Sequence, residues 1–357
     1  MRNHCNSLLT ETPPLVTLGR AIFVWKRGTG RLRKRIVLLA LCLLSLVPTG
    51  CHGGIAAFNP FRPAASPTPF SPPSFHNATS PLDIPTYDGS GQAVHPDVVY
   101  FAKGWHSHKY WMAVTPYPNG NDSRENPSML VSDDGQNWSP PPGLQNPIVP
   151  APACDHNSDP DLVYNPDNDK LYLYYTRQAR SKRCANQNAN DILVVTSGDG
   201  VKWSAPQSVM RWNLDSYPLY LSPAVVLVNG TFHMWMAGGG GVLHTTSKDG
   251  ITWSPVQQVE LAATPWHLDV LYFDKQYMMD YVDSPNASAR LMLATSSDGL
   301  KWTTYPDALL SPSSGWDNER IYRSTLLYDS GARLFKLWYS AKSNNGQWHI
   351  GYAESAQ

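Results

Sequence analysis

Charged residues are scarce in this chain. They make up 16% of its 357 residues, whereas the sequence contains 31 prolines and 25 glycines. Neither a helical bundle nor a solvated disordered chain has such a composition. The 13 tryptophans and 18 tyrosines supply bulky side chains for a core and for a binding surface. We therefore expect a β-rich, loop-rich globular protein.

Several catalytic motifs are also missing. The sequence has no His-Glu-x-x-His and no paired Cys-x-x-Cys, which argues against zinc chemistry. The glycine run at 238–241 lacks the Gly-Lys-Ser/Thr ending of a phosphate loop. The first 50 residues hold eight Lys or Arg and one Glu, so residues 51–357 carry a net charge of −7, which argues against nucleic-acid binding.

The N-terminal segment has the pattern of an export signal. A basic run at 31–35 precedes mainly apolar residues at 36–47, a stretch that is short for a membrane-spanning helix. Gly50 before Cys51 resembles a bacterial lipobox, although Pro48 departs from its usual pattern. Residues 1–50 are thus predicted to be a lipoprotein-type signal peptide, with lipidation of Cys51 and anchoring to the membrane at the bacterial cell surface. An uncleaved N-terminal anchor is the alternative.

Two further features follow from an exported location. Residues 51–90 are rich in proline and serine and are predicted to form an extended linker. In an oxidising compartment, Cys154 and Cys184 are expected to form a disulfide. The remaining residues, 91–357, form the folded domain.

A repeat organises this domain. The pattern Ser-x-Asp-Gly-x-x-Trp occurs four times and ends at Trp138, Trp203, Trp253 and Trp302, with intervals of 65, 50 and 49 residues. Asp-Gly supplies a tight turn, Ser can bond to the turn backbone, and Trp packs back over the hairpin. These aspartates are therefore structural, and we assign them no catalytic role.

Short β-patterns surround each of these boxes. Three strands precede every box, and a fifth set of strands at 324–353 has none. Four strands per unit at a period of 40 to 50 residues indicate propeller blades. The sequence therefore predicts an all-β, five-bladed β-propeller with four-stranded antiparallel blades, whose fifth blade is completed by residues within 82–94.

The boxes, the five units and the repeated strand order resemble the five-bladed propeller superfamily of arabinanases, invertases and levansucrases, particularly glycoside hydrolase family 43. The resemblance covers about residues 92–355 and implies an inverting hydrolase with an Asp base, a second Asp that orients and tunes, and a Glu acid. The boxes also resemble those of sialidases, which have six blades.

In such a propeller, the innermost strand of each blade starts at the face that holds the site. This rule selects candidate catalytic and substrate-binding residues. The resemblance implies that Asp97 is the base and that Asp159 is the tuning residue, with Asp161 as the competing choice. The other residues predicted to reach the site are Asp269, His95, His267, Trp105, Trp266, Tyr322 and Arg323.

The general acid does not match the family pattern. The chain has only five glutamates, and neither blade three nor blade four begins with one. Glu125 and Glu319 are the glutamates that can reach the site, and we favour Glu125. The aspartates can instead bond to neighbouring backbone. His95 and His267 are interpreted as hydrogen-bonded residues rather than metal ligands, and no cofactor is expected, although a calcium ion on the propeller axis near His267 is compatible with the resemblance.

The leading hypothesis is a surface-tethered, monomeric glycoside hydrolase acting on a polysaccharide or oligosaccharide. The missing glutamate supports an alternative, a carbohydrate-binding lipoprotein of the same fold without activity. A sialidase, using Arg124, Arg320 and Arg323 with Tyr322, ranks lower because of the blade count. A propeller that docks other proteins is a further alternative.

Overall fold

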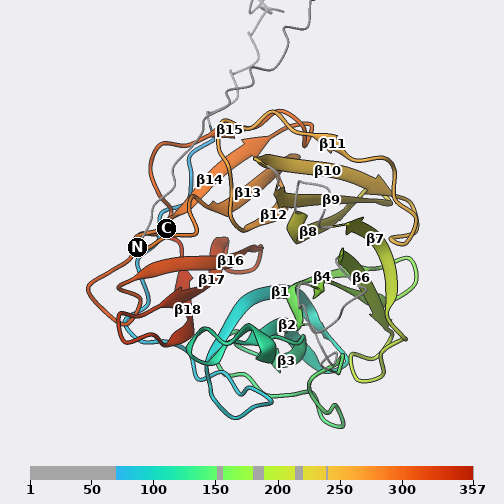
Figure 1. Ribbon diagram of the computed structural model, residues 1–357, viewed down its shortest axis with the longest axis horizontal. Coiled ribbons are helices and arrows are strands. Elements are labelled where there is room, and N and C mark those ends of the chain that lie inside the picture. Colours follow the sequence, from blue (N-terminus) through green and yellow to red (C-terminus); the bar gives the residue numbers. More distant parts are fainter. Residues whose placement is uncertain (1–69, 151–155, 180–188, 214–219, 239, 357) are drawn as a thin grey trace, which may run out of the picture. The chain divides into compact units, whose positions relative to one another are not determined.

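The chain folds into a five-bladed β-propeller. The computed structural model describes residues 70–150, 156–179, 189–213, 220–238 and 240–356. Their strands form five antiparallel sheets arranged around a common centre (Figure 1). The predicted all-β class and blade count are therefore confirmed, with four strands in blades two, three and four and three strands in blades one and five among the described residues. The signal and lipidation predictions, as well as Cys154 and Cys184, lie outside the described residues. Within those residues, we find no helical segment with the length and apolarity needed to cross a bilayer.

Each blade is a meander that starts with its innermost strand. Blade one consists of β1 (Ala93–Trp105), β2 (His108–Pro116) and β3 (Ser128–Ser132), and blade two of β4 (His156–Asn165), β5 (Lys170–Ala179), β6 (Ala189–Ser197) and β7 (Gln207–Asn213). Blade three consists of β8 (Tyr220–Val228), β9 (Thr231–Gly238), β10 (Gly241–Ser247) and β11 (Gln257–Gln258). Blade four consists of β12 (Leu268–Phe273), β13 (Gln276–Val282), β14 (Leu291–Ser296) and β15 (Thr303–Thr304), and blade five of β16 (Arg320–Asp329), β17 (Leu334–Lys342) and β18 (Trp348–Glu354). Two short 3₁₀ turns, η1 (Pro118–Gly120) and η2 (Asp122–Arg124), follow β2.

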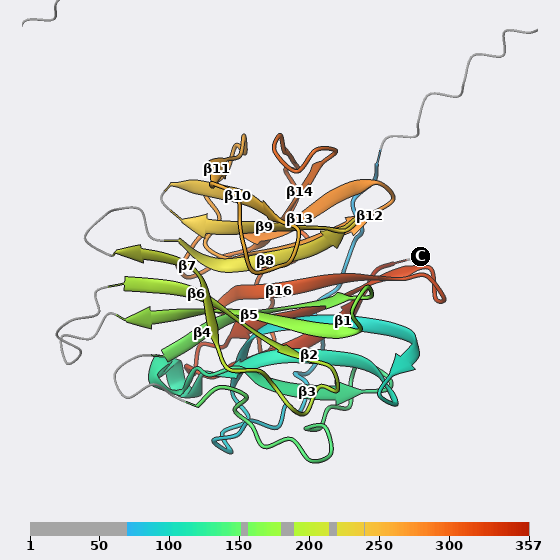
Figure 2. The same cartoon turned by 90° about the vertical axis from the view of Figure 1, so that its right-hand side faces the viewer.

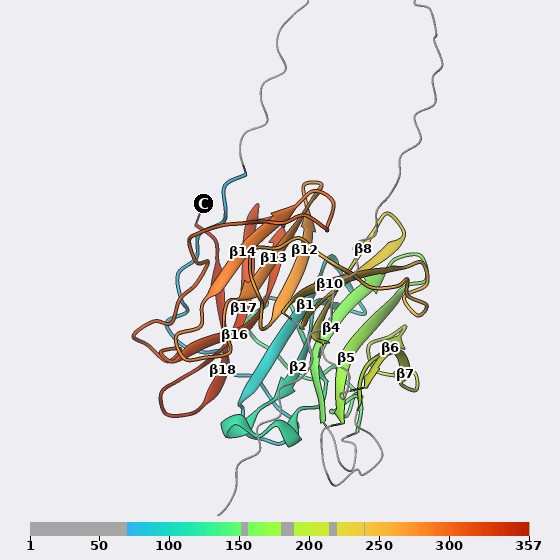
Figure 3. The same ribbon diagram turned by 45° about the horizontal axis from the view of Figure 1, so that its top comes forward.

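The inner strands close the ring. β1, β4, β8, β12 and β16 each contact the next inner strand, and β16 returns to β1. From the side, blade two lies between blade one and blade three (Figure 2). The tilted view shows β1 and β4 side by side near the axis (Figure 3). Because the ring is closed at its centre, the starts of all five inner strands meet on one face.

Residues 70–92 are packed against blade five and its two neighbours, blades four and one, which corrects the predicted linker. Phe75 and Ile84 are buried, and the Leu82 N–H donates to Ile350 O of β18 at 2.8 Å. Asn77 donates to the buried carboxylate of Asp317 at 2.6 Å. Apolar side chains interspersed among the prolines give this segment enough buried area to stay docked. It covers the outer edge of β18 where a fourth strand was expected, although blade five itself has three strands.

The four boxes form identical turns. In each, the Ser hydroxyl accepts the N–H of the box glycine at 2.8 or 2.9 Å, and the Asp carboxylate accepts two backbone N–H groups. In the third box, the N–H groups of Thr252 and Ile251, together with the Ser247 hydroxyl, lower the pKa of Asp249 to about 2. The structural role predicted for the box aspartates is therefore confirmed.

The boxes also join neighbouring blades. An aromatic side chain from the preceding blade covers each box glycine: Trp338 over Gly135, Trp111 over Gly200, Tyr174 over Gly250 and Trp235 over Gly299. Trp235 also donates its indole N–H to Gly299 O at 2.8 Å. Each glycine has a positive φ and no room for a side chain. The box thus fixes its own hairpin and the position of the next blade at once.

We predict that Gly299→Ala destabilises the protein more than Gly230→Ala. Both glycines have similar φ values of 75° and 69°, so an alanine costs about 1 to 2 kcal/mol of strain at either site. A Cβ at residue 299 would lie 2.8 Å from Trp235, whereas nothing lies within 4 Å at residue 230. Overpacking should add about 1 to 3 kcal/mol at Gly299. Equal midpoints for the two variants in thermal or denaturant unfolding would contradict this account of the box.

Candidate active site

The backbone at the start of three inner strands is strained in the same way. His95, Asp159 and Ser222 each precede a proline and have φ values of 56°, 51° and 54°. The strand pairing is interrupted by an irregularity at each of these positions. A left-handed residue before proline is unfavourable, and such strain is typical of functional sites. These bulges change the direction of three polar side chains, near the starts of their strands, from that of a regular strand.

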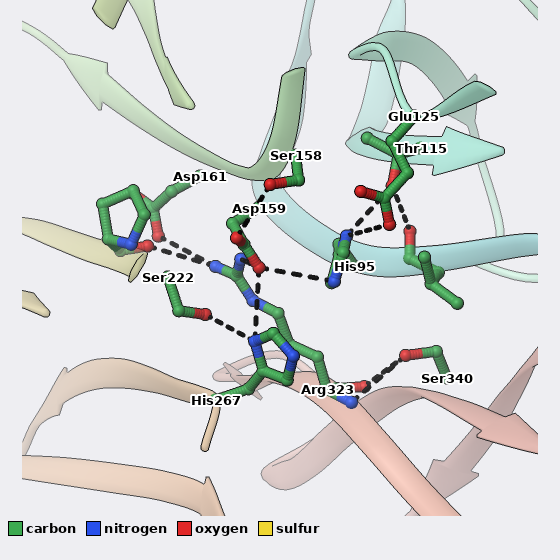
Figure 4. A network of polar contacts seen from close by, with 12 residues as sticks. His95, Thr115, Glu125, Ser158, Asp159, Asp161, Ser222, His267, Arg323 and Ser340 are labelled. Atoms are coloured by element: carbon green, nitrogen blue, oxygen red, sulfur yellow. Dashed lines mark hydrogen bonds and ion pairs between the residues drawn. The ribbon is translucent and has the colours of Figure 1, made fainter. Parts of the chain in front are cut away.

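We call the first layer of side chains at the axis the upper tier: His95, Asp159, Ser222, His267 and Tyr322. One oxygen of Asp159, Oδ1, lies 3.3 Å from His95 Nε2 and 3.2 Å from His267 Nδ1 (Figure 4). The other oxygen, Oδ2, accepts the Ser158 hydroxyl at 3.0 Å. His95 Nδ1 lies 3.0 Å from the Thr115 hydroxyl, so both rings and the carboxylate are held by neighbours.

Three buried atoms of the upper tier lack hydrogen-bond partners. They are His95 Nε2, His267 Nε2 and Asp159 Oδ1. Burial lowers the pKa of both histidines, and Arg323 adds to this effect, so both imidazoles are neutral. Neutral imidazoles and carboxylates are ligands that transition-metal ions bind. Buried polar atoms normally have a partner, such as a hydrogen-bonding group, a water molecule or an ion.

The spacing of the donors fits a metal ion, which differs from the interpretation of His95 and His267 as hydrogen-bonded residues rather than metal ligands. His95, Asp159 and His267 can each offer a ligand atom, all within 4.8 Å of one another. Two atoms bound to one ion at about 2.1 Å are roughly 3.0 to 3.4 Å apart at tetrahedral to octahedral angles. Asp159 Oδ1 is 3.3 Å from His95 Nε2 and 3.2 Å from His267 Nδ1, and both separations fall in this range. Two nitrogen donors suit Zn²⁺ or Mn²⁺ better than Ca²⁺, which prefers oxygen.

Arg323 lies below the upper tier and is 1% exposed. Its guanidinium is 3.6 Å from Asp159 and 3.9 Å from Asp161, and it donates to Pro223 O at 3.1 Å. Burial opposes the ionisation of Asp159, but the hydrogen bond of His267 and the positive charge of Arg323 help to hold its pKa below the usual range. Asp159 is therefore an anion. Arg323, predicted to bind substrate, is instead a buried partner of these carboxylates.

Asp97, Asp161 and Asp269 form a lower tier beneath the guanidinium, with their ligand atoms within 4.8 Å of one another. Asp97 Oδ2 accepts the N–H of Leu162, and Asp161 Oδ2 accepts the N–H of Val225 at 3.0 Å. Each of these two carboxylates therefore ties its strand to the next inner strand. Burial and the charge of Asp269 raise the pKa of Asp97 to about 7. Asp97 and Asp161 are thus engaged by backbone N–H groups of the next inner strand, whereas Asp159 contacts the two imidazoles.

Glu125 joins the upper tier from the end of η2. Its carboxylate is 3% exposed and lies 3.5 Å from His156 Nε2 and 3.9 Å from His95 Nδ1. Burial raises the pKa of Glu125 well above its usual value, and the charge of Asp159 contributes. Glu125 and Asp159 contact opposite nitrogens of the His95 ring, and a buried carboxyl group with a raised pKa can accept or release a proton.

Two predicted site residues lie elsewhere. Trp105 is buried at the far end of β1, where it packs on Phe101 and Trp111, because the turn after an inner strand lies opposite the site. Glu319 is at the rim of blade five and receives hydrogen bonds from Arg320 and Lys342 at 2.8 and 2.9 Å. These bonds outweigh partial burial and lower its pKa, so Glu319 is unsuited to act as an acid.

Trp266 and Tyr322 do belong to the site. Trp266 is 36% exposed and packs against His267. The Tyr322 ring lies 4.5 Å from that of His267 and 5.3 Å from that of His95. An exposed indole next to a buried polar cluster is a suitable surface for the apolar face of a sugar.

Sequence reasoning missed Thr115, His156 and Asp280. Asp280 is buried on β13 and accepts the Ser324 hydroxyl of the adjacent blade. A carboxylate in the apolar run Tyr277–Val282 was a signal that the strand meets a polar partner. A proline follows His95, Asp159 and Ser222 alike. This repeated x-Pro was a second signal, because it marks equivalent positions near the starts of three inner strands.

Comparisons with known proteins fit this architecture. No family model matches the sequence. The chain is 28% identical to an A type blood N-acetyl-α-D-galactosamine deacetylase of Flavonifractor plautii, over 83% of this chain and 49% of the relative. It thus spans about half the length of that curated relative.

Solved structures show the same fold. The crystal structure of an N-acetylgalactosamine deacetylase from F. plautii, in complex with blood group B trisaccharide, matches with a TM-score of 0.71 and 28% identity over 79% of this chain and 95% of that chain. An exo-1,5-α-L-arabinanase from a bovine ruminal metagenomic library matches with a TM-score of 0.54 and 14% identity over 74% and 92%. This chain therefore has the five-bladed propeller fold of glycoside hydrolases, with a carbohydrate deacetylase among its homologues.

We predict that Asp280→Asn makes stability less dependent on pH. Burial, with the charge of Asp269, raises the pKa of Asp280 well above its ordinary value. The folded state then binds a proton that the unfolded state has lost, so the free energy of unfolding falls as pH rises above about 4. Asparagine keeps an acceptor for Ser324 without this charge, and should be more stable at pH 8 by a few kcal/mol, on the order of 1 to 4.

Urea unfolding between pH 4 and 8 measures this difference. Asp280→Ala is the control, because it removes the charge together with the acceptor for Ser324. Parallel stability curves for the wild type and Asp280→Asn would show that the carboxyl group does not carry this dependence.

Proposed function

We propose that this chain is a metal-dependent hydrolase that removes the acetyl group from an N-acetylated sugar. The observation that carries the proposal is that two unpartnered buried atoms, His95 Nε2 and Asp159 Oδ1, lie together with His267 Nδ1 at a spacing that suits one divalent ion. The similarity to an N-acetylgalactosamine deacetylase supports it. A bound divalent ion would polarise the acetamide carbonyl and activate a water molecule.

The residues of the chain then have distinct tasks. Asp159 and the two histidines would hold the ion, while Thr115 and Ser158 orient them through His95 Nδ1 and Asp159 Oδ2. Glu125 takes a proton from the attacking water and delivers it to the leaving nitrogen. A C–O bond forms at the carbonyl carbon and the C–N bond breaks, so that acetate and the free amino sugar are released. Trp266 presents its exposed ring to the sugar.

A glycoside hydrolase is the second candidate. One observation favours it: the pKa of Glu125 is raised and that of Asp159 is lowered, which are the properties of an acid and a base. In this alternative, Glu125 protonates the leaving oxygen and Asp159 activates water, in place of Asp97. Export and lipid anchoring stay predictions from the sequence.

One experiment separates the two candidates. The full chain is incubated with a synthetic α-glycoside of N-acetylgalactosamine, and acetate, free amine and free sugar are quantified. We expect acetate and amine in equal amounts, loss of release after chelation, and recovery with Zn²⁺ or Mn²⁺. Asp159→Asn should reduce the rate more than about 100-fold, whereas Asp133→Asn on the surface should not. Free sugar without acetate would support the glycosidase, and neither product would contradict both.

We further predict that Glu125→Gln separates metal binding from turnover. The amide keeps the size of the side chain but cannot take a proton from water, so turnover should fall by about 10² to 10⁴-fold. Metal content and dissociation constant, measured by elemental analysis and calorimetry, should stay close to the wild type. His95→Gln should instead lose bound metal. Loss of metal from Glu125→Gln would show that Glu125 is a ligand rather than a proton carrier.

A further inference from the structure

Tyr322 occupies the blade-five position of the upper tier, where the other blades contribute His95, Asp159, Ser222 and His267. Tyr322 is partly exposed, whereas Ser222 in the same tier and Arg323 below it are buried. The Ser222 hydroxyl is paired with His267 Nδ1 at 2.9 Å, and Arg323 lies beneath the tier. Tyr322 is therefore a partly exposed residue whose ring contacts both histidines of the polar cluster.

Aromatic neighbours fix the ring of Tyr322. Its centroid lies 4.8 Å from that of Trp348, in an edge contact, and 6.2 Å from that of Tyr117, nearly parallel at 10°. His95 and His267 pack on it from the axis. Contacts on several sides leave the ring little freedom, so the direction of its hydroxyl is set before a substrate arrives.

The Tyr322 hydroxyl is paired with Trp266. The indole N–H of Trp266 donates a hydrogen bond to the phenol oxygen. An indole N–H can only donate, so it occupies the acceptor side of the phenol oxygen. The phenol hydrogen is then left to point elsewhere, and a fixed donor of this kind suits an oxygen that gains negative charge.

We propose that Tyr322 donates its hydroxyl hydrogen to the carbonyl oxygen of the substrate acetamide, and that Trp266 orients this hydroxyl while its ring supports the sugar. The proposal rests on the deacetylase function above and adds a catalytic residue to it. No proton is transferred from Tyr322: its hydrogen bond strengthens as the carbonyl carbon becomes tetrahedral and weakens when acetate forms. Trp266 acts as a positioning residue through its N–H.

The test compares Tyr322→Phe with the wild type in the acetate-release assay. Removing one such donor costs about 10² to 10³-fold in kcat. We expect a loss of this size with KM, bound metal and thermal midpoint near the wild-type values. Tyr272→Phe, at the far end of β12, makes the same chemical change away from the site and should leave kcat unchanged.

Two variants of Trp266 divide its roles. Trp266→Phe keeps an aromatic face but removes the N–H, and should lower kcat by about 3 to 10-fold with little change in KM, as expected for the loss of one hydrogen bond. Trp266→Ala should also raise KM. If the wild type releases acetate and Tyr322→Phe does so at the same kcat, this inference is overturned and the deacetylase proposal stands. If the wild type releases no acetate, the deacetylase proposal fails and the inference falls with it.

Discussion

The carboxylates that the inner strands bring to the propeller axis can be buried together because the guanidinium of Arg323 lies among them. It is 1% exposed and close to both Asp159 and Asp161, and its charge lowers the pKa of Asp97, Asp269 and Asp280 against the effect of burial. The same positive charge helps to keep Asp159 ionised. Fold and site therefore share one electrostatic centre: the lower carboxylates tie neighbouring strands together, and the upper one remains an anion available for chemistry.

The fold was predictable because its signals are local. A Ser-x-Asp-Gly-x-x-Trp turn needs only contacts within seven residues, and four copies at a regular spacing reveal the blades. The rule that inner strands start at the site face also selected His95, Asp159, His267 and Tyr322 correctly as neighbours. It could not rank them, because a bulge decides whether Asp97 or the residue two positions earlier reaches the upper tier. Pairing His95 with His267 requires blades one and four to meet across the axis, which no local pattern encodes.

The role of the N-terminal segment was beyond sequence reasoning for a similar reason. Its prolines indicate an extended chain, and residues 74–92 are indeed without assigned strands or helices until a short turn. What composition does not reveal is a partner: Asn77 and Ile84 are ordered by Asp317 and by the core between blades five and one. Trp105 was wrongly expected to bind substrate, because a tryptophan can either stack on a sugar or pack in a core. Its position at the far end of β1, in contact with Trp111, shows that it packs in the core.

The left-handed residues before proline have a consequence for how such sites change over time. His95, Asp159 and Ser222 share one backbone shape but carry an imidazole, a carboxylate and a hydroxyl. At each bulge, the strand sets the backbone geometry, and the identity of one residue sets the chemistry. A new reaction could then arise by substituting a few side chains at these bulge positions, with the propeller fold unaltered. The free-energy cost of the strained backbone would stay the same, because the left-handed conformation at these positions is what presents each new side chain to the site.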